Sequence, residues 1–186
     1  MKMLTGAPKS RRIAGGRWKS IAVSRTVMAP LHPDFKEFLR LLNAEGVQYL
    51  LIGGYAVAHY GYNRTTADMD IWIAIHPDTA QKMVTVLARF GMKAEEVVPE
   101  LFLQKGDMIR MGVPPVRIEI LNDISGVTFA ECYQRRERVD IDGVPVSVIH
   151  IDDLKRNKQA SARYKDLDDL QNLNSLKPNS KSGENR

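Results

Sequence analysis

The sequence predicts a single domain of mixed α and β structure, an α+β fold in which a small mixed sheet is flanked by helices. Runs of apolar residues with helical spacing alternate with short strand-like runs along residues 28–176, which is typical of this class. A length of 186 residues with 44% hydrophobic content is enough to bury one core, but not two independent ones.

Each expected element has a local signal. Helices are expected where apolar residues recur every three to four positions and a glycine stands at the end, as Gly46 and Gly91 do. Strands are expected where apolar and polar residues alternate. In chain order the expected elements are a helix over 33–45, a strand over 47–52, a short helix over 56–61, a strand over 67–75, a helix over 77–90, a strand over 116–121, a helix over 128–136, a hairpin around 142–143 and a helix over 152–176.

The two ends are expected to be disordered. Residues 1–27 form a basic leader with seven basic and no acidic side chains, and residues 177–186 form a polar tail. A targeting peptide or a nucleic-acid-binding arm is the alternative role for the leader. The whole chain has a formal charge of +5, whereas residues 28–176 alone have a formal charge of −4. The high pI therefore does not predict a basic surface that follows a nucleic-acid backbone.

The remaining composition indicates a soluble cytoplasmic protein that has no membrane partner. No stretch approaches the roughly 20 consecutive apolar residues of a membrane-spanning helix, and the N-terminus lacks the apolar core of a secretory signal. The single cysteine, Cys132, excludes an internal disulfide.

Two carboxylates on one strand are the first candidates for a metal site. Side chains alternate between the faces of a strand, so Asp68 and Asp70 share the face opposite Met69 and Ile71. Their Cα atoms would lie about 6.6 Å apart. Their oxygens could then converge on Mg²⁺ or Mn²⁺, which would also take triphosphate oxygens. A solvent-facing strand is the alternative explanation.

A third acid would complete such a site. In the strand over 116–121 the alternation places Glu119 on the polar face, together with Arg117. Asp123, just beyond the strand, is the alternative.

Gly53 and Gly54 stand before the short helix that leads to the acidic strand. Glycine allows a close backbone approach, and the N-terminus of the helix offers N–H groups suited to phosphate. A simple turn is the alternative.

The last helix carries charges among its apolar residues. At about 100° per residue, one arc contains Lys158, Arg163, Asp166 and Asp169 together with Ala162, Leu170 and Leu173. These charges either serve a ligand at the edge of a cleft or form ion pairs that clamp the helix to the body. Asp153 and Lys165 are expected on the opposite, solvated face, and Trp72 is expected to pack under this helix.

Three segments together resemble the minimal nucleotidyltransferases of the polymerase-beta-like superfamily, especially bacterial proteins related to AbiEii-type toxins. They are GGYAVAHYG at 53–61, RTTADMDI at 64–71 and NKQASARYKDLDDL at 157–170. The resemblance extends over residues 47–173. Gly-Gly stands at 53–54, where the superfamily often has Gly-Ser.

The resemblance implies a nucleotidyltransferase fold whose C-terminal helix closes the active-site cleft. It implies Mg²⁺ or Mn²⁺ on Asp68, Asp70 and Glu119, which with Lys158 would be catalytic. The implied nucleotide-binding residues are Gly53, Gly54, Arg64, Thr65, Thr66, Lys158, Arg163, Asp166 and Asp169.

By the same resemblance the substrate is a nucleoside triphosphate, and the acceptor is a transfer RNA, another RNA, a protein or a small molecule. The protein would be a toxin with an antitoxin partner. The alternative is a catalytically silent module of a toxin-antitoxin pair that binds nucleotide or a partner protein.

Overall fold

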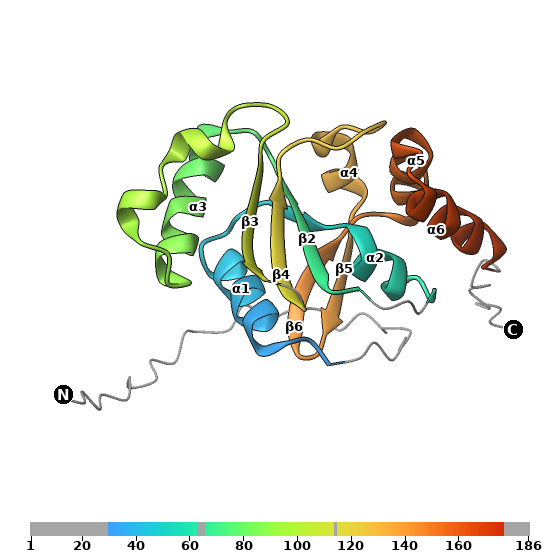
Figure 1. The fold of residues 1–186 in the computed structure, drawn as a ribbon, viewed down its shortest axis with the longest axis horizontal. Helices are drawn as coiled ribbons and strands as arrows, with labels where there is room; N and C mark the ends of the chain where they lie inside the picture. The colour runs from blue at the N-terminus through green and yellow to red at the C-terminus, as the bar shows by residue number, and fades with distance from the viewer. Residues whose placement is uncertain (1–29, 63–65, 114, 177–186) are drawn as a thin grey trace, which may run out of the picture.

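The computed structural model describes residues 30–62, 66–113 and 115–176, and it confirms a mixed α+β fold with one six-stranded sheet flanked by helices (Figure 1). The expected disordered leader and tail lie outside the described residues. Among the helices of the described ranges, none has the length and apolar character needed to cross a membrane.

The sheet has the strand order β3-β4-β2-β1-β6-β5. Its strands are β1 (Tyr49–Leu51), β2 (Asp68–Ile73), β3 (Met108–Val113), β4 (Val116–Leu121), β5 (Glu137–Ile141) and β6 (Val144–Val148). The inner pairs β2–β4 and β1–β6 are parallel, whereas β1–β2 and the outer hairpins β3–β4 and β5–β6 are antiparallel. The acid-bearing strands β2 and β4 are therefore direct neighbours.

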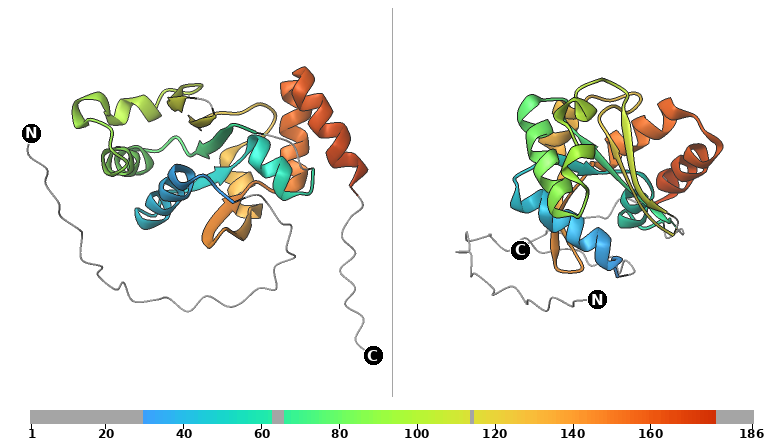
Figure 2. Two further views of the ribbon diagram at one scale, coloured as in Figure 1. Left: turned by 60° about the horizontal axis from the view of Figure 1, so that its bottom comes forward. Right: turned by 60° about the vertical axis from the view of Figure 1, so that its left-hand side comes forward.

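Helices cover both faces of this sheet. They are α1 (Pro33–Ala44), α2 (Gly53–His59), α3 (Pro77–Arg89), α4 (Phe129–Arg135), α5 (Ile151–Ser161) and α6 (Tyr164–Ser175), with short 3₁₀ turns at Ala94–Glu96 and Pro99–Phe102. Helices α1 and α3 lie on one side of the sheet, and α5 and α6 lie on the other (Figure 2).

The helices α1, α3 and α5 begin in the same way. In each, a histidine precedes the first turn, and its Nδ1 accepts a hydrogen bond from the backbone N–H of the aspartate two residues later. The three histidines are His32, His76 and His150. Each ring thus satisfies one of the N–H groups that a helix leaves free at its start, which accounts for their place in the sequence without a metal.

The core lies between the sheet and the helices α1 and α3. The alternation predicted for β2 is confirmed, because Met69, Ile71 and Ile73 are completely buried. From α1, Phe38 and Leu39 are also completely buried. This packing leaves the opposite face of β2 to Asp68, Asp70 and Trp72.

Helix α4 contacts the polar side of the sheet and the start of α5, and one expectation about this region, the solvent exposure of Asp153, was wrong. Trp72 packs edge to face against Phe129 of α4, with ring centroids 5.2 Å apart. Asp153, expected in solvent, is only 1% exposed and forms ion pairs with Arg135 and Arg156. Both contacts arise because α4 lies beside the sheet, a position that helical periodicity within one segment cannot reveal.

The last helix was expected to be continuous but is two helices. The chain breaks at Ala162, which has a left-handed backbone with φ of 52°, and α6 starts after Arg163. Strand β3 was not expected at all. Only Met111 of its six residues is buried, since β3 lies at the edge of the sheet, and it therefore shows no apolar alternation.

Candidate active site

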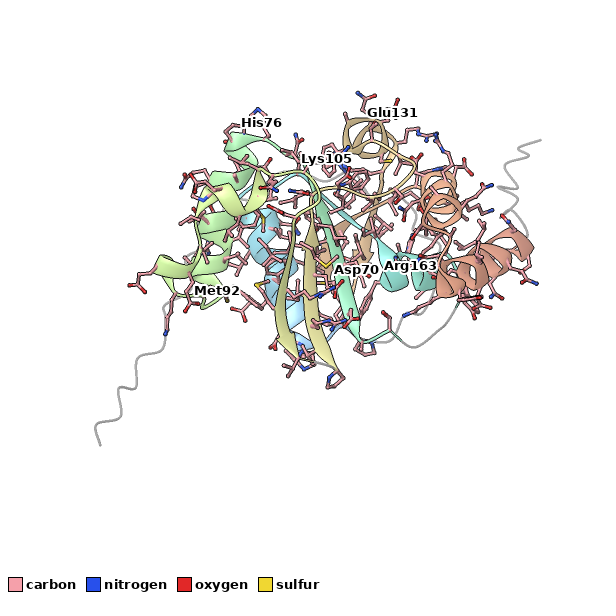
Figure 3. The ribbon with its side chains drawn as sticks, turned by 45° about the horizontal axis from the view of Figure 1, so that its top comes forward. Asp70, His76, Met92, Lys105, Glu131 and Arg163 are labelled. Atoms are coloured by element: carbon pink, nitrogen blue, oxygen red, sulfur yellow. The ribbon has the colours of Figure 1, made fainter. Side chains whose placement is uncertain are left out.

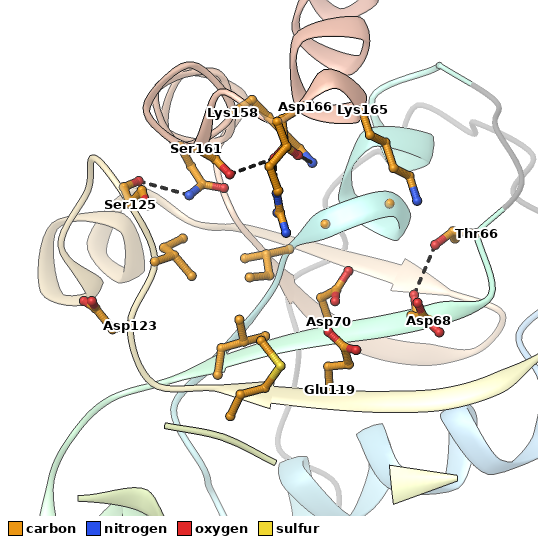
Figure 4. A pocket seen from close by; sticks show the side chains of 18 of the residues that line it. Thr66, Asp68, Asp70, Glu119, Asp123, Ser125, Lys158, Ser161, Lys165 and Asp166 are labelled. Carbon is orange, nitrogen blue, oxygen red and sulfur yellow. Dashed lines mark hydrogen bonds and ion pairs between the residues drawn. The ribbon is translucent and has the colours of Figure 1, made fainter. Parts of the chain in front are cut away.

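A cleft of about 530 Å³ opens between the polar face of β2 and β4 and the turn that joins α5 to α6 (Figure 4). Its volume is in the usual range for ligand sites. The predicted site residues that line it are Gly53, Gly54, Thr66, Asp68, Asp70, Glu119, Lys158, Arg163 and Asp166. Asp169 lies behind Lys158, and Arg64 and Thr65 lie outside the described residues. The structure therefore brings the two distant sequence motifs to one cleft.

The pairing of β2 with β4 places three acids together, which we call the acidic face: Asp68, Asp70 and Glu119. In this parallel pair Asp70 lies directly opposite Glu119, while Asp68 lies opposite Arg117. Neighbouring strands are about 4.8 Å apart, so the side chains of opposite residues interact. Asp123 also lines the cleft, but it lies beyond the strand, where it pairs with Lys105.

Ionisation of Asp70 is disfavoured by its surroundings in the acidic face. Burial raises its pKa to about 6, and repulsion from Glu119 and Asp68 adds to this effect. Attraction from Lys158 and a hydrogen bond from the backbone N–H of Gly54 offset part of the shift. A carboxylate that is costly to ionise without a cation is typical of a functional site.

Gly53 makes this position of Asp70 sterically feasible. It has a positive φ of 61°, and a Cβ atom on it would lie 1.8 Å from Oδ2 of Asp70. The N–H of Gly54 is already engaged by the same carboxylate. In this structure the glycine pair therefore makes room for the side chain of Asp70 and hydrogen-bonds it. The sequence pattern predicted only phosphate binding or a turn for these glycines.

We expect Gly53→Ala to destabilise the protein strongly. The left-handed backbone costs an alanine about 1–2 kcal/mol, and overpacking against Asp70 adds about 1–3 kcal/mol. Denaturant unfolding of Gly46→Ala provides the control, since Gly46 has nearly the same φ of 62° and open space around it. Adding Asp70→Ala to Gly53→Ala should restore part of the loss. Equal losses for the two single variants would contradict a role of Gly53 in seating Asp70.

Two arginines contact the acidic face. Nη2 of Arg117 lies 2.7 Å from Oδ2 of Asp68 and 3.2 Å from Oε1 of Glu119. Nε of Arg110 lies 3.0 Å from the same oxygen of Glu119. Alternation along β4 indicates the face of Arg117 but not its role, and no sequence signal marks Arg110, because edge strand β3 lacks apolar alternation.

Asp68 and Asp70 fit a divalent metal, whereas Glu119 would first have to change partners. Oδ1 of Asp68 is buried and accepts no hydrogen bond from the described residues, and Asp70 is under the repulsion described above. Carboxylate oxygens are the ligands that Mg²⁺ prefers. Glu119 is held by two arginines, and the described residues contain no group of three acidic, histidine or cysteine side chains arranged to hold a metal.

The opposite wall of the cleft is an ion-pair network. Lys158 is only 5% exposed, and its Nζ lies 2.5 Å from Oδ1 of Asp166 and 2.9 Å from Oδ2 of Asp169. The other oxygen of Asp166 accepts hydrogen bonds from Nε of Arg163, at 2.6 Å, and from Oγ of Ser161, at 2.7 Å. Of the two explanations that the sequence left open for these charges, this geometry favours the structural ion pairs.

The charged residues predicted to lie together are therefore in contact, but they come from two helices and not from one face of a continuous helix. In a continuous helix Lys158 and Asp166 would be separated by about 12 Å along the axis. The break at Ala162 folds α6 back toward α5 and closes this distance. Hydrogen bonds from Lys158, Arg163 and Ser161 outweigh the effect of burial and hold the pKa of Asp166 below its usual value.

The break also turns Lys165 toward the cleft. Lys165 is exposed, as expected, but it also lines the cleft from the start of α6 and points toward Thr66 and Asp68 (Figure 4). It forms no ion pair with any residue of the described ranges. Arg163 faces the same cleft from the residue before α6, and Figure 3 shows it beside Asp70. These two cations are the exposed basic groups across from the acidic face.

Comparisons with known proteins identify a family and a similar fold. Residues 32–184 match a family described as nucleotidyl transferase of unknown function (DUF2204). No curated protein matches the chain. A proposed nucleotidyltransferase from Thermotoga maritima has a similar structure, with a TM-score of 0.50 and 15% identity over 75% of this chain and 88% of that chain.

An antigenic nucleotidyltransferase-like protein from Paracoccidioides brasiliensis gives a TM-score of 0.45 and 18% identity over 78% of each chain. The similarity to the Thermotoga structure concerns the fold. The expected relation to AbiEii-type toxins stays a prediction.

Proposed function

Because the chain belongs to the DUF2204 family of nucleotidyl transferases, we propose that it uses a divalent metal to transfer a nucleoside monophosphate from a nucleoside triphosphate to an acceptor. The observation that carries the proposal is the acidic face, with its partly buried, repelling carboxylates, opposite the cations Arg163 and Lys165 across one cleft. Carboxylates suit a metal, and the cations suit the triphosphate that the metal would also bind.

Asp68 and Asp70 would hold Mg²⁺ or Mn²⁺, which when bound supplies Lewis acidity to the triphosphate and lowers the pKa of the acceptor hydroxyl. Strand β2 fixes both side chains, because its other face is anchored in the core. Glu119 would complete the ligand set or accept the proton of the acceptor. The acceptor oxygen attacks the α-phosphorus, the bond to the β-phosphate oxygen breaks, and pyrophosphate leaves.

The cations would position and neutralise the triphosphate. Arg163 is shared between the nucleotide and Asp166, whereas Lys165 has no carboxylate partner within the described ranges. Lys158 contacts Asp166 and Asp169, and its contribution to phosphate binding would be to fix the wall that carries Arg163. Most of the catalytic effect would then come from positioning and charge stabilisation.

We expect Lys165→Met to weaken binding of the triphosphate about tenfold without changing the stability of the nucleotide-free protein. One charge-assisted contact to phosphate is worth roughly 1.5 kcal/mol or more, and no internal ion pair is broken. Isothermal titration with each triphosphate measures the affinity. Lys155→Met, on α5 and outside the cleft lining, is the control. An affinity for Lys165→Met equal to that of the control would remove Lys165 from the nucleotide site.

The experiment that tests the function follows a labelled phosphate. The protein is incubated with each α-labelled triphosphate, Mg²⁺, and either total RNA or a protein extract, with chelator in a parallel sample. We expect label to move to one acceptor class only when the metal is present. A transfer RNA, another RNA, a protein hydroxyl and a small molecule all suit this chemistry, because the fold does not set the acceptor.

The silent alternative has a distinct outcome in the same assay. A protein that binds triphosphate but moves no label to any acceptor would be the nucleotide-binding or partner-binding module of a toxin-antitoxin pair. The toxin role itself predicts that production of the wild-type chain arrests growth and that a cognate antitoxin relieves the arrest.

A further inference from the structure

Arg117 occupies the position where a cation would contact the acidic face. It shares one face of β4 with Glu119, two residues away, and lies opposite Asp68 on β2. Its Nη2 atom contacts both carboxylates at once, at 2.7 Å and 3.2 Å. A divalent cation on these acids would therefore compete with the guanidinium for the same oxygens.

The contact leaves polar atoms unsatisfied on both sides. Oδ1 of Asp68 and Nε of Arg117 are buried, and neither has a hydrogen-bond partner among the described residues. A buried polar atom without a partner costs about 1–3 kcal/mol. The arginine thus neutralises charge on the acidic face without saturating the carboxylate, and a metal would have a free oxygen to bind first.

Arg117 also has room to leave. Its side chain is 29% exposed and lines the cleft, so the guanidinium can swing along the cleft on its flexible stem. Arg110 is different, because its side chain is 61% exposed and Glu119 is its one ion-pair partner among the described residues. The two arginines carry equal charge close to the same acids, but only Arg117 touches Asp68.

We propose that Arg117 is an exchangeable counter-cation, which holds Asp68 and Glu119 in the metal-free protein and is displaced by the divalent cation onto the triphosphate. This inference rests on the proposed function. The protein could thereby stay folded without metal although three acids lie close together. The displaced guanidinium, with its Nε–H free, would become a phosphate ligand. Arg117 is then a positioning residue before the reaction and a binding residue during it.

Competition predicts opposite effects of one substitution on two ligands. If the arginine-bound form makes up about nine-tenths of the metal-free protein, its removal tightens metal binding about tenfold. The same substitution removes a phosphate ligand, so the metal-loaded protein should bind triphosphate more weakly, again about tenfold. If only the loss of a positive charge near the acids mattered, substitution of Arg117 and of Arg110 would change the affinity for the metal equally.

The test uses the full chain and two probes. Mn²⁺ binding without nucleotide is followed by electron paramagnetic resonance for wild type, Arg117→Gln, Arg110→Gln and Asp70→Asn. Binding of inorganic tripolyphosphate is then measured at saturating Mn²⁺, since this probe has the chemistry common to all triphosphates. Thermal unfolding confirms that each variant is folded, and Arg117→Lys serves in place of Arg117→Gln if the latter does not fold.

We expect Arg117→Gln to bind Mn²⁺ about tenfold more tightly and tripolyphosphate about tenfold more weakly, with clearly smaller changes for Arg110→Gln. Equal Mn²⁺ affinities for the two arginine variants would overturn the exchange. If Asp70→Asn binds Mn²⁺ as well as wild type does, or if wild type and Arg117→Gln both fail to bind it, the metal proposal itself falls. Loss of Mn²⁺ binding in Asp70→Asn with wild-type affinity in Arg117→Gln refutes the exchange alone.

Discussion

Replacing Asp70 with Asn is expected to abolish transfer of labelled nucleotide and, at the same time, to stabilise the metal-free protein. The substitution removes a proposed metal ligand, so no transfer should remain above background. It also removes a charge that burial and the neighbouring acids disfavour, as the pKa of about 6 shows. The gain in the free energy of unfolding should be on the order of 1–3 kcal/mol at neutral pH.

The stability difference should depend on pH in a defined direction. The pKa of Asp70 is higher in the folded protein than in the unfolded chain, where it is near 3.8. The folded state therefore binds more protons between about pH 4 and pH 6, and the stability of the wild type falls as the pH rises through this window. The advantage of Asp70→Asn should be absent at pH 4 and complete above pH 6 in chelator-treated protein.

Asp123→Asn is the matched control for this prediction. Asp123 lines the same cleft but pairs with the exposed Lys105, and its replacement should leave both transfer and stability nearly unchanged. Denaturant unfolding at several pH values and the label assay measure the two properties. Full transfer by Asp70→Asn would remove the acidic face from the mechanism, and loss of transfer by Asp123→Asn would make Asp123 the third acid.

The second large effect is expected from Lys158→Met, which should destabilise the nucleotide-free protein by about 3 kcal/mol. Lys158 lies between two buried carboxylates, and removing one member of a buried ion pair is strongly destabilising because the remaining buried charges lose an opposite charge at contact distance. The pKa of Asp166 is lowered in the folded state. Its share of the stability is therefore present above about pH 4 and lost as the pH falls further.

Lys155→Met provides the control, because it removes the same chemical group from α5, where no ion pair with a described residue is broken. Thermal and denaturant unfolding compare the two variants. Adding Asp166→Asn to Lys158→Met should recover part of the loss, since one of the two buried negative charges that faced the lysine is removed. If Lys158→Met is as stable as Lys155→Met, Lys158 does not stabilise the fold through its ion pairs, and direct binding of phosphate becomes its function.

The acidic face was predictable from the sequence because its signal is local. Alternation along β2 and β4 fixes which side chains share a face, and both strands were located to within two residues. Their parallel pairing was not encoded in either segment, yet it decides that Asp70 meets Glu119. The approach of Gly53 to Asp70 is likewise a tertiary contact, which a glycine in a sequence cannot specify.

The wall across the cleft was predicted correctly in its residues but not in its shape. Ala162 is a good helix former, and no glycine or proline marks a break there. The break is stabilised by ion pairs that exist only after α6 has folded back, so Asp166 and Lys158 outweigh local propensity. This difference accounts for the position of Lys165 at the cleft, which a continuous helix did not predict.

The strand order has a consequence for how the protein acquires its activity during synthesis. Strand β1 pairs with β6, in which Leu51 lies opposite Val148. The centre of the sheet is therefore complete only after Val148 has been synthesised. Contacts between such distant segments form slowly, because a long loop has to close. A nascent chain that already displays Asp68, Asp70 and Glu119 still lacks α5 and α6, which supply Lys158, Arg163 and Lys165. Both sides of the cleft are therefore present only when the ribosome has released almost the entire described domain, and an incomplete chain has acids but no site for a triphosphate.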